Sequence, residues 1–295
     1  MSRRSSSERA LEGLLELTVR ASGVTAIILV GLIFLFLLKE SWPLFRAVPL
    51  GALLTGRQWY PISDVPQFGV LPLICGTLLV TAGATVIAVP LGIACAMYIA
   101  EVSPRWLAEW LKAGVELLAA IPSVVIGVVG MTLVAPVVKQ LFGLPTGLTA
   151  LTGSLTLAFM ALPTIVSLTE DAIAAVPRRY REAALAVGAT HWQTMYRIVV
   201  PAAAPGMLAA VMLGIGRVIG ETMAVMMITG NAAVIPHSWL VPVRTLTATI
   251  AAEMGETVRG STHYAALFGI GLLLFLMTFL INVAGDWFLH RRRMS

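Results

Sequence analysis

Long apolar runs separated by short charged segments are the main pattern along this chain. Six runs hold the roughly 20 mostly apolar residues that a helix needs to cross the hydrocarbon core of a bilayer. They lie at about 21 to 39, 70 to 99, 113 to 138, 148 to 168, 205 to 229 and 263 to 288. The pattern predicts an all-α polytopic membrane protein with six transmembrane helices.

Composition agrees with this prediction and excludes a soluble protein. Of 295 residues, 58% are hydrophobic and 12% are charged, whereas soluble domains carry about 25% charged residues. The formal net charge of +5 does not indicate a nucleic-acid partner, because most basic residues flank apolar runs. Cys75 and Cys95 would lie about 30 Å apart on one helix. We interpret them as small apolar residues rather than as a redox or metal site.

The basic residues predict the orientation. They concentrate in segments 1–20 and 178–197 and in the tail 289–295, and the short segment 101–112 adds Arg105 and Lys112. With an even number of spans both termini lie on one side, and the positive-inside rule makes that side cytoplasmic. The first apolar run follows basic residues as in a signal peptide, but no small-residue cleavage site follows it. We therefore interpret this run as an uncleaved first span.

Segments 40–69, 139–147 and 230–262 are then expected on the outer side. The third is amphipathic around Leu246 and Ile250, which predicts a short interfacial helix. Aromatic residues near span ends are expected at the membrane interfaces. They are Trp42, Trp59, Tyr60, Trp106, Trp110, Trp239 and Trp287.

Two prolines at similar places in spans three and four, Pro122 and Pro163, leave two interpretations open. Proline leaves a backbone carbonyl inside a span without its helical hydrogen bond. Such a carbonyl is tolerated beside a cavity or where neighbouring groups donate a hydrogen bond to it. The prolines therefore mark either helix breaks next to a path through the membrane or ordinary kinks in packed helices.

The segment 181–206 is the least apolar stretch between two spans. Pro177 suits a first helical position, and a helix is expected from Arg178 to Val187. Gly188 then favours a left-handed stop, and Thr190 followed by Gln193 is typical of a capping box that starts a second helix. The pattern predicts a helix–turn–helix, which by itself could be only a solvated connector.

The spacing within this segment resembles the EAA motif of ABC importer membrane subunits, E-A-A-x3-G-x9-I-x-L-P, with Val200 in place of the leucine. In that family the two short helices dock into a cleft on a cytoplasmic ATPase. The resemblance therefore implies a coupling role for the residues that match the motif. These are Glu182, Ala183, Ala184, Gly188, Ile198 and Pro201.

Further stretches, at 116–130, 216–225, 245–256 and 263–275, resemble the permease subunits of phosphate ABC importers of the PstC type. The resemblance implies a type I ABC importer transmembrane domain over 70–288 in a bacterial inner membrane. It also implies four kinds of partner: a PstA-like permease subunit, two copies of a PstB-like ATPase, a periplasmic PstS-like phosphate-binding protein and membrane lipid, with no nucleic acid.

Besides the transmembrane domain over 70–288, we expect four further parts of the chain. The first 20 residues are expected to be a cytoplasmic segment, and residues 21–69 are expected to form the first span and an outer loop. The coupling loop is expected at about 170–204, and the basic tail 289–295 is expected in the cytoplasm.

Arg217 and Glu221 are charged residues within the fifth run. Their spacing of four would place them on one face of a continuous helix. Each unpaired charge in a span costs roughly 2.5 to 3.5 kcal/mol on insertion scales, so they should face protein or water. They could form a structural ion pair. The resemblance instead implies a substrate pathway in which the guanidinium binds phosphate and Glu221 holds the guanidinium in position.

No nucleotide site is evident in the sequence, because a P-loop needs Gly-Lys followed by Ser or Thr. Lys39, Lys112 and Lys139 follow Leu, Leu and Val. We therefore expect no enzyme activity and no cofactor on this chain, with ATP and Mg²⁺ on the partner ATPase. Two alternatives stay open: an ABC permease for another oxyanion such as molybdate or sulfate, and a proton-coupled secondary transporter.

Overall fold

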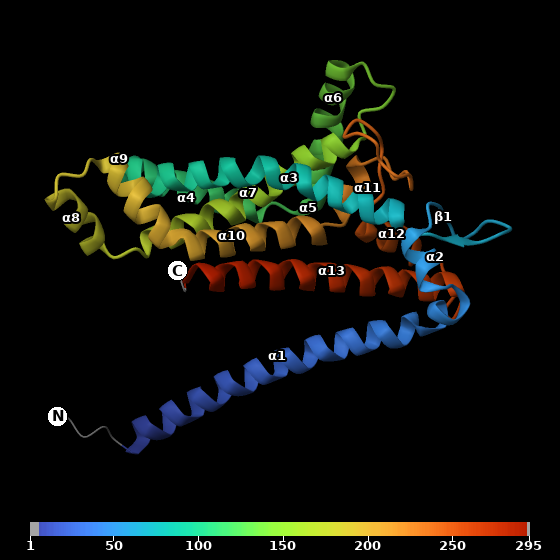
Figure 1. Ribbon diagram of the computed structural model, residues 1–295, viewed down its shortest axis with the longest axis horizontal. Coiled ribbons are helices and arrows are strands. Elements are labelled where there is room, and N and C mark those ends of the chain that lie inside the picture. Colours follow the sequence, from blue (N-terminus) through green and yellow to red (C-terminus); the bar gives the residue numbers. More distant parts are fainter. Residues whose placement is uncertain (1–5, 294–295) are drawn as a thin grey trace.

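Long helices account for most of the chain (Figure 1). A computed structural model describes the backbone of residues 6–293 and the side chains of residues 15–287. The basic side chains expected in the cytoplasm at Arg3, Arg4, Arg9 and in the tail 289–295 lie outside this described part. Six helical stretches in it are long and apolar enough to cross a membrane, which confirms the prediction of an all-α polytopic protein. They are Leu15–Ala47, Leu71–Val102, Ser123–Phe142, Ala150–Ala174, His191–Gly220 and Thr262–Trp287.

Helices, short π-helical turns (marked η) and one pair of short strands follow one another along the chain. In sequence order they are α1 (Ser6–Ala47), α2 (Leu50–Thr55), β1 (Trp59–Tyr60), β2 (Gln67–Phe68), α3 (Leu71–Met97), η1 (Tyr98–Val102), α4 (Arg105–Ala120), α5 (Ser123–Val129), η2 (Gly130–Val134), α6 (Ala135–Phe142), α7 (Ala150–Ala174), α8 (Arg178–Ala186), α9 (His191–Thr194), η3 (Met195–Val199), α10 (Val200–Gly220), α11 (Met223–Ile228), α12 (Leu246–Glu253) and α13 (Thr262–Arg293).

Helix α7 lies at the centre of the bundle and packs against α3 and α10. Small residues make this close packing possible. A Cβ atom added at Gly92 of α3 or at Gly214 of α10 would lie 2.7 or 2.6 Å from the side chain of Ile165 on α7. The three helices therefore form a tight core, and α7 is the most buried of the six spans.

Helix α1 contributes little to this core. It contacts α13 and diverges from it toward its first residues (Figure 1). Leu44 lies against Gly269, and the rings of Phe34 and Phe275 are 5.6 Å apart. The beginning of α1 and the end of α13 point to the same end of the molecule as α8 and α9, as an even number of spans requires.

Several expected spans have different boundaries, and the first, expected at 21–39, runs from Leu15 to Ala47. The third, expected at 113–138, is broken because Pro122 takes an extended conformation (ψ 138°) between α4 and α5. Most of the expected connector 101–112 therefore belongs to helix α4. Pro163, in contrast, lies within the uninterrupted helix α7. The fifth span, expected at 205–229, starts at His191 and ends at Gly220.

The outer segments also differ from expectation. Helix α12 exists, but Leu246, Ala248 and Thr249 are fully buried, so it is a core element rather than an interfacial helix. Strands β1 and β2 pair antiparallel, with Trp59 opposite Phe68. Trp59 is 2% exposed, and its expected place at the membrane interface is therefore wrong. The indole instead serves as a buried hydrogen-bond donor.

Candidate functional site

The predicted helix–turn–helix is present between α7 and α10. Pro177 precedes α8 as its N-cap, one position earlier than expected. Gly188 has φ +85°, the left-handed conformation that glycine adopts without steric penalty. Thr190 and Gln193 form the reciprocal capping box, with donor–acceptor distances of 3.2 and 2.9 Å. Local sequence signals therefore determine this segment.

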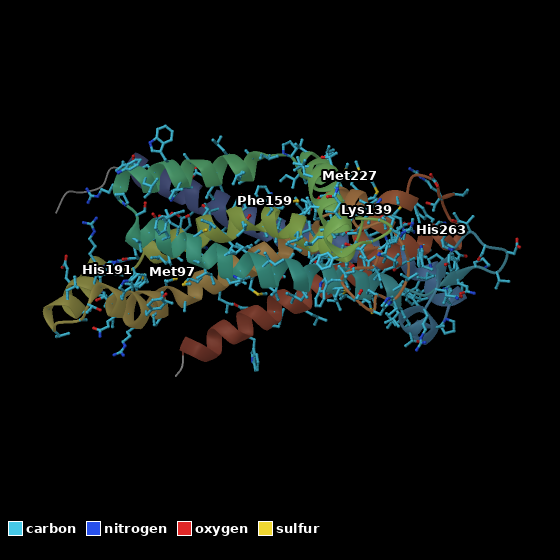
Figure 2. The ribbon with its side chains drawn as sticks, turned by 90° about the horizontal axis from the view of Figure 1, so that it is seen from above. Met97, Lys139, Phe159, His191, Met227 and His263 are labelled. Carbon is cyan, nitrogen blue, oxygen red and sulfur yellow. The ribbon has the colours of Figure 1, made fainter. Side chains whose placement is uncertain are left out.

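Most motif residues of this segment are exposed. Glu182, Ala183, Gly188, Ile198 and Pro201 lie at the surface, whereas Ala184 is buried. They share this end of the molecule with His191, far from His263 at the opposite end (Figure 2). Ala184 thus anchors the segment and leaves the other motif residues accessible.

Large apolar side chains surround the motif and are also exposed. They are Leu185, Val187, Trp192 and Tyr196, which we call the coupling surface. The rings of Trp192 and Tyr196 stack with their centroids 5.8 Å apart. Exposed apolar side chains grouped beside polar ones at one end of a protein are typical of protein interfaces.

A partly buried ion pair fastens the segment to η1, which continues α3. Arg181 donates to Glu101 at 2.6 Å, and their side chains are 21% and 8% exposed. Arg181 also donates to the carbonyl oxygens of Ile173 and Val176, and the ring of His191 contacts the carbonyl of Glu101 at 3.2 Å. Sequence reasoning missed Glu101, although a single carboxylate at the end of the second apolar run was a usable signal.

A second tie joins α4 to α7 near the same end. Lys112 contacts Glu170 at 2.5 Å and Asp171 at 3.1 Å. The hydrogen bonds to Glu170 and then to Asp171 raise the pKa of Lys112 above its ordinary value, against the opposing effect of burial. The two carboxylates thus hold α4 against the central helix through a charged lysine.

Arg217 and Glu221 are not on one face of one helix, because α10 ends at Gly220 and Glu221 is extended (φ −68°, ψ 132°). Their side chains point to different partners. Arg217 donates to the Thr164 hydroxyl oxygen at 3.0 Å. The Glu221 carboxylate accepts from the backbone N–H of Ala224 at 3.2 Å. Among the described residues, Arg217 forms no ion pair with Glu221 or any other carboxylate.

The break at Glu221 is stabilised by a distant element. Thr247 of α12 donates its hydroxyl to the carbonyl oxygen of Glu221 at 2.8 Å, and α12 is held in turn by a bond from the Leu246 N–H to the Thr77 hydroxyl. Unwound backbone inside a membrane is found where protein buries it or where it lines a cavity. Sequence reasoning missed Thr164 and Thr247, since no local pattern distinguishes them.

At the opposite end, one carboxylate joins three outer segments. Glu253 accepts from the Trp59 indole at 3.1 Å and from Arg244 at 2.7 Å, and its other oxygen lies 2.8 Å from the His263 ring. Within the described residues no group of three or more His, Cys, Asp or Glu side chains could hold a metal ion. The Glu253 cluster is therefore a fastening between β1, α12 and α13.

These features define a class of protein. It is a polytopic helical membrane protein with an exposed helix–turn–helix at one end. Its bundle contains an arginine that forms no ion pair with any carboxylate of the described residues. Residues 88–294 match the model of the family described as "Binding-protein-dependent transport system inner membrane component". The chain belongs to this family of transport permeases.

Curated relatives cover most of the chain. A "Probable ABC transporter permease protein YqgH" from Bacillus subtilis (strain 168) is 42% identical over 240 residues, 81% of this chain and 78% of that protein. The phosphate transport system permease protein PstC of Mesorhizobium japonicum is 37% identical over 293 residues, 93% of this chain and 88% of that protein. The PstC of Haemophilus influenzae is 32% identical over 292 residues, 92% of this chain and 91% of that protein.

Solved structures share the fold. A chain of a bacterial alginate ABC transporter, in complex with an alginate pentasaccharide-bound periplasmic protein, has a TM-score of 0.64 at 16% identity and covers 98% of both chains. A chain of the inward-facing MetNI methionine ABC transporter has a TM-score of 0.59 at 20% identity, over 75% of this chain and 96% of that one. These likenesses confirm the expected fold of an ABC importer transmembrane domain.

Proposed function

We propose that this chain is the permease subunit of an ATP-driven importer of inorganic phosphate. The α8–Gly188–α9 segment carries the proposal, because its exposed motif residues and coupling surface suit a mechanical input from another protein. The phosphate specificity is supported by the similarity to two PstC proteins over more than nine-tenths of this chain. It is also supported by an arginine inside the bundle that no carboxylate of the described residues neutralises.

The partners follow from this role. Two ATPase subunits bind ATP and Mg²⁺ and hydrolyse ATP, one of them docking on the coupling surface. A PstA-like permease completes the path, and a periplasmic PstS-like protein delivers phosphate to the end that carries the Glu253 cluster. Both termini and the α8–α9 segment face the cytoplasm, as the basic residues at 178–197 favour.

The proposed mechanism is alternating access. Closure of the ATPases moves α8 and α9, and the Arg181–Glu101 pair transmits this motion through η1 to α3. The path then opens outward, and phosphate enters a low-affinity site at Arg217, whose N–H groups suit its oxygens. Hydrolysis returns the permease to the inward-open state.

Uptake of labelled phosphate by proteoliposomes that contain the complete complex tests the proposal. We expect uptake to require the binding protein outside and ATP at the ATPase side, and to persist when an ionophore collapses the proton gradient. Uptake that follows the proton gradient without ATP would identify a secondary transporter instead. Uptake of labelled molybdate or sulfate under the same conditions, without uptake of labelled phosphate, would assign the chain to another oxyanion.

A further inference from the structure

The surroundings of Arg217 contain one group that has no place in the proposed mechanism, the hydroxyl of Thr164. Thr164 lies roughly 15 Å along α7 from its end at Ala174, which places it near the middle of the span. Phe159, about one turn earlier on α7, lies between the two ends of the molecule in Figure 2. The Thr164 oxygen accepts from Arg217, and the contact is only partly buried.

The hydroxyl proton of Thr164 is not used within the described part of the protein. Some helical threonines of this chain donate to the carbonyl one turn earlier, as Thr77 does to Leu73 and Thr132 does to Val128, both at 2.8 Å. Thr164 makes no such bond to the residues that the structure describes. Its oxygen is occupied by the guanidinium, and its O–H is free to donate.

The guanidinium has spare donors too. Across residues 15–287, Arg217 has Thr164 as its one hydrogen-bond partner, while arginine carries several N–H groups. Glu221 forms no ion pair with it, and one oxygen of that carboxylate accepts from the backbone N–H of Ala224 instead. Arg217 is itself only partly buried. An added Cβ at Gly216 or Gly220 of the same helix would meet no atom within 4 Å, so one side of this part of α10 is uncovered. Donors without acceptors beside open space are the arrangement that an oxyanion completes.

We propose that Thr164 is the second ligand of the oxyanion site. Its O–H donates to a phosphate oxygen, while its oxygen keeps the Arg217 guanidinium in the orientation that binds the same anion. This inference rests on the proposed function. Thr164 on α7 would lie opposite the arginine of α10, and the two helices would bind phosphate together. Thr164 is then both a ligand and a positioning residue.

Three variants of the complete complex in proteoliposomes test the role of Thr164. Thr164→Val removes the hydroxyl at nearly constant volume, and we expect phosphate uptake at saturating binding protein to fall about 10-fold or more. Thr164→Ser keeps the hydroxyl and should retain most of the wild-type rate. Thr169→Val is the matched control on α7, because Thr169 is fully buried and its hydroxyl has no partner in the described part of the chain. Uptake by Thr164→Val equal to wild type would overturn the proposal.

A binding measurement separates this role from a structural one. Phosphate should protect Arg217 from modification by phenylglyoxal, followed by mass spectrometry, in the wild type and in Thr164→Ser but not in Thr164→Val. Loss of uptake with protection unchanged would also overturn the proposal. If the wild-type complex takes up no phosphate, the proposed function fails, whereas protection that depends on the Thr164 hydroxyl would still support the site.

Discussion

Arg217 is a cation inside a span whose only hydrogen-bond partner in the described part of the chain is a hydroxyl. A charge in this position normally faces a water-filled path or protein, because desolvation without a partner is unfavourable. Because the arginine forms a single hydrogen bond in the described part of the chain, we expect its replacement to affect the fold little. Its remaining N–H groups are available to bind an anion.

We therefore expect Arg217→Gln to abolish transport while leaving the complex assembled. Loss of charge-assisted hydrogen bonds should reduce phosphate uptake by roughly 100-fold. The yield of co-purified ATPase and the melting temperature should stay near the wild-type values. Uptake at the wild-type rate would exclude Arg217 from the path.

The positions of Arg217 and Glu221 could be found from the sequence, but their relation could not. A spacing of four places residues on one face only in a continuous helix. The break at Glu221 depends on the Thr247 hydroxyl, 26 positions away in the sequence. Glu101 and Thr164 were missed for the same reason, since their partners Arg181 and Arg217 lie 80 and 53 positions away.

At the scale of elements, the α8–α9 segment depends on one left-handed residue. Gly188→Val should destabilise the turn by about 1 to 2 kcal/mol, because a side chain with a branched Cβ resists φ +85°. We expect less co-purified ATPase and a lower ratio of phosphate transported to ATP hydrolysed.

Asparagine is the matched control for this turn, because it tolerates the left-handed region better than other residues. Gly188→Asn should therefore retain most of the coupling. Equal coupling in the valine and wild-type complexes would show that the turn geometry is not required.

The Arg181–Glu101 pair fastens the same segment to η1 at the end of α3. Glu101→Gln leaves a partly buried guanidinium without its counter-charge, which we expect to destabilise the protein by about 1 to 3 kcal/mol. A lower melting temperature of the purified complex and weaker ATPase binding should result. Glu109→Gln, at an exposed carboxylate of α4, is the control and should change neither quantity. Identical melting curves for the two variants would contradict a fastening role for Glu101.

Elements whose signals are local were predictable, and those fixed by distant contacts were not. Gly188, Thr190 and Gln193 determine α8 and α9 from their own sequence, and the structure agrees. Helix α12 was expected at an interface because the segment around Leu246 and Ile250 has an amphipathic helical pattern. Its threonines instead bond to buried backbone and to one another, which allows a partly polar helix to lie in the core.

At the scale of the whole molecule, hydropathy predicted the number of spans and their order but not every boundary. Helix α4 carries Arg105, Glu109, Lys112 and Glu116 and is too polar to be recognised as part of a bundle. Its packing against α7 depends on carboxylates that lie 58 and 59 positions beyond Lys112. A hydropathy profile contains no information about such pairs.

The orientation predicts opposite labelling of two surface positions. In a variant with Cys75 and Cys95 replaced by serine, a membrane-impermeant thiol reagent applied to intact cells should label Ile62→Cys and not Val187→Cys. Both side chains are exposed, at 79% and 85%. Opening the cells should make Val187→Cys reactive. Labelling of both positions, or the reverse pattern, in intact cells would contradict the proposed orientation.

The burial of Trp59 gives the molecule an intrinsic optical probe. The other six tryptophans are each at least 46% exposed, whereas Trp59 is 2% exposed and bonded to the Glu253 carboxylate. Indole emission shifts with the polarity of its surroundings, and the difference between the spectra of the wild type and Trp59→Phe isolates the component that arises from this one residue. Any rearrangement of the outer end during transport should be visible as a change in that component, without attaching a dye.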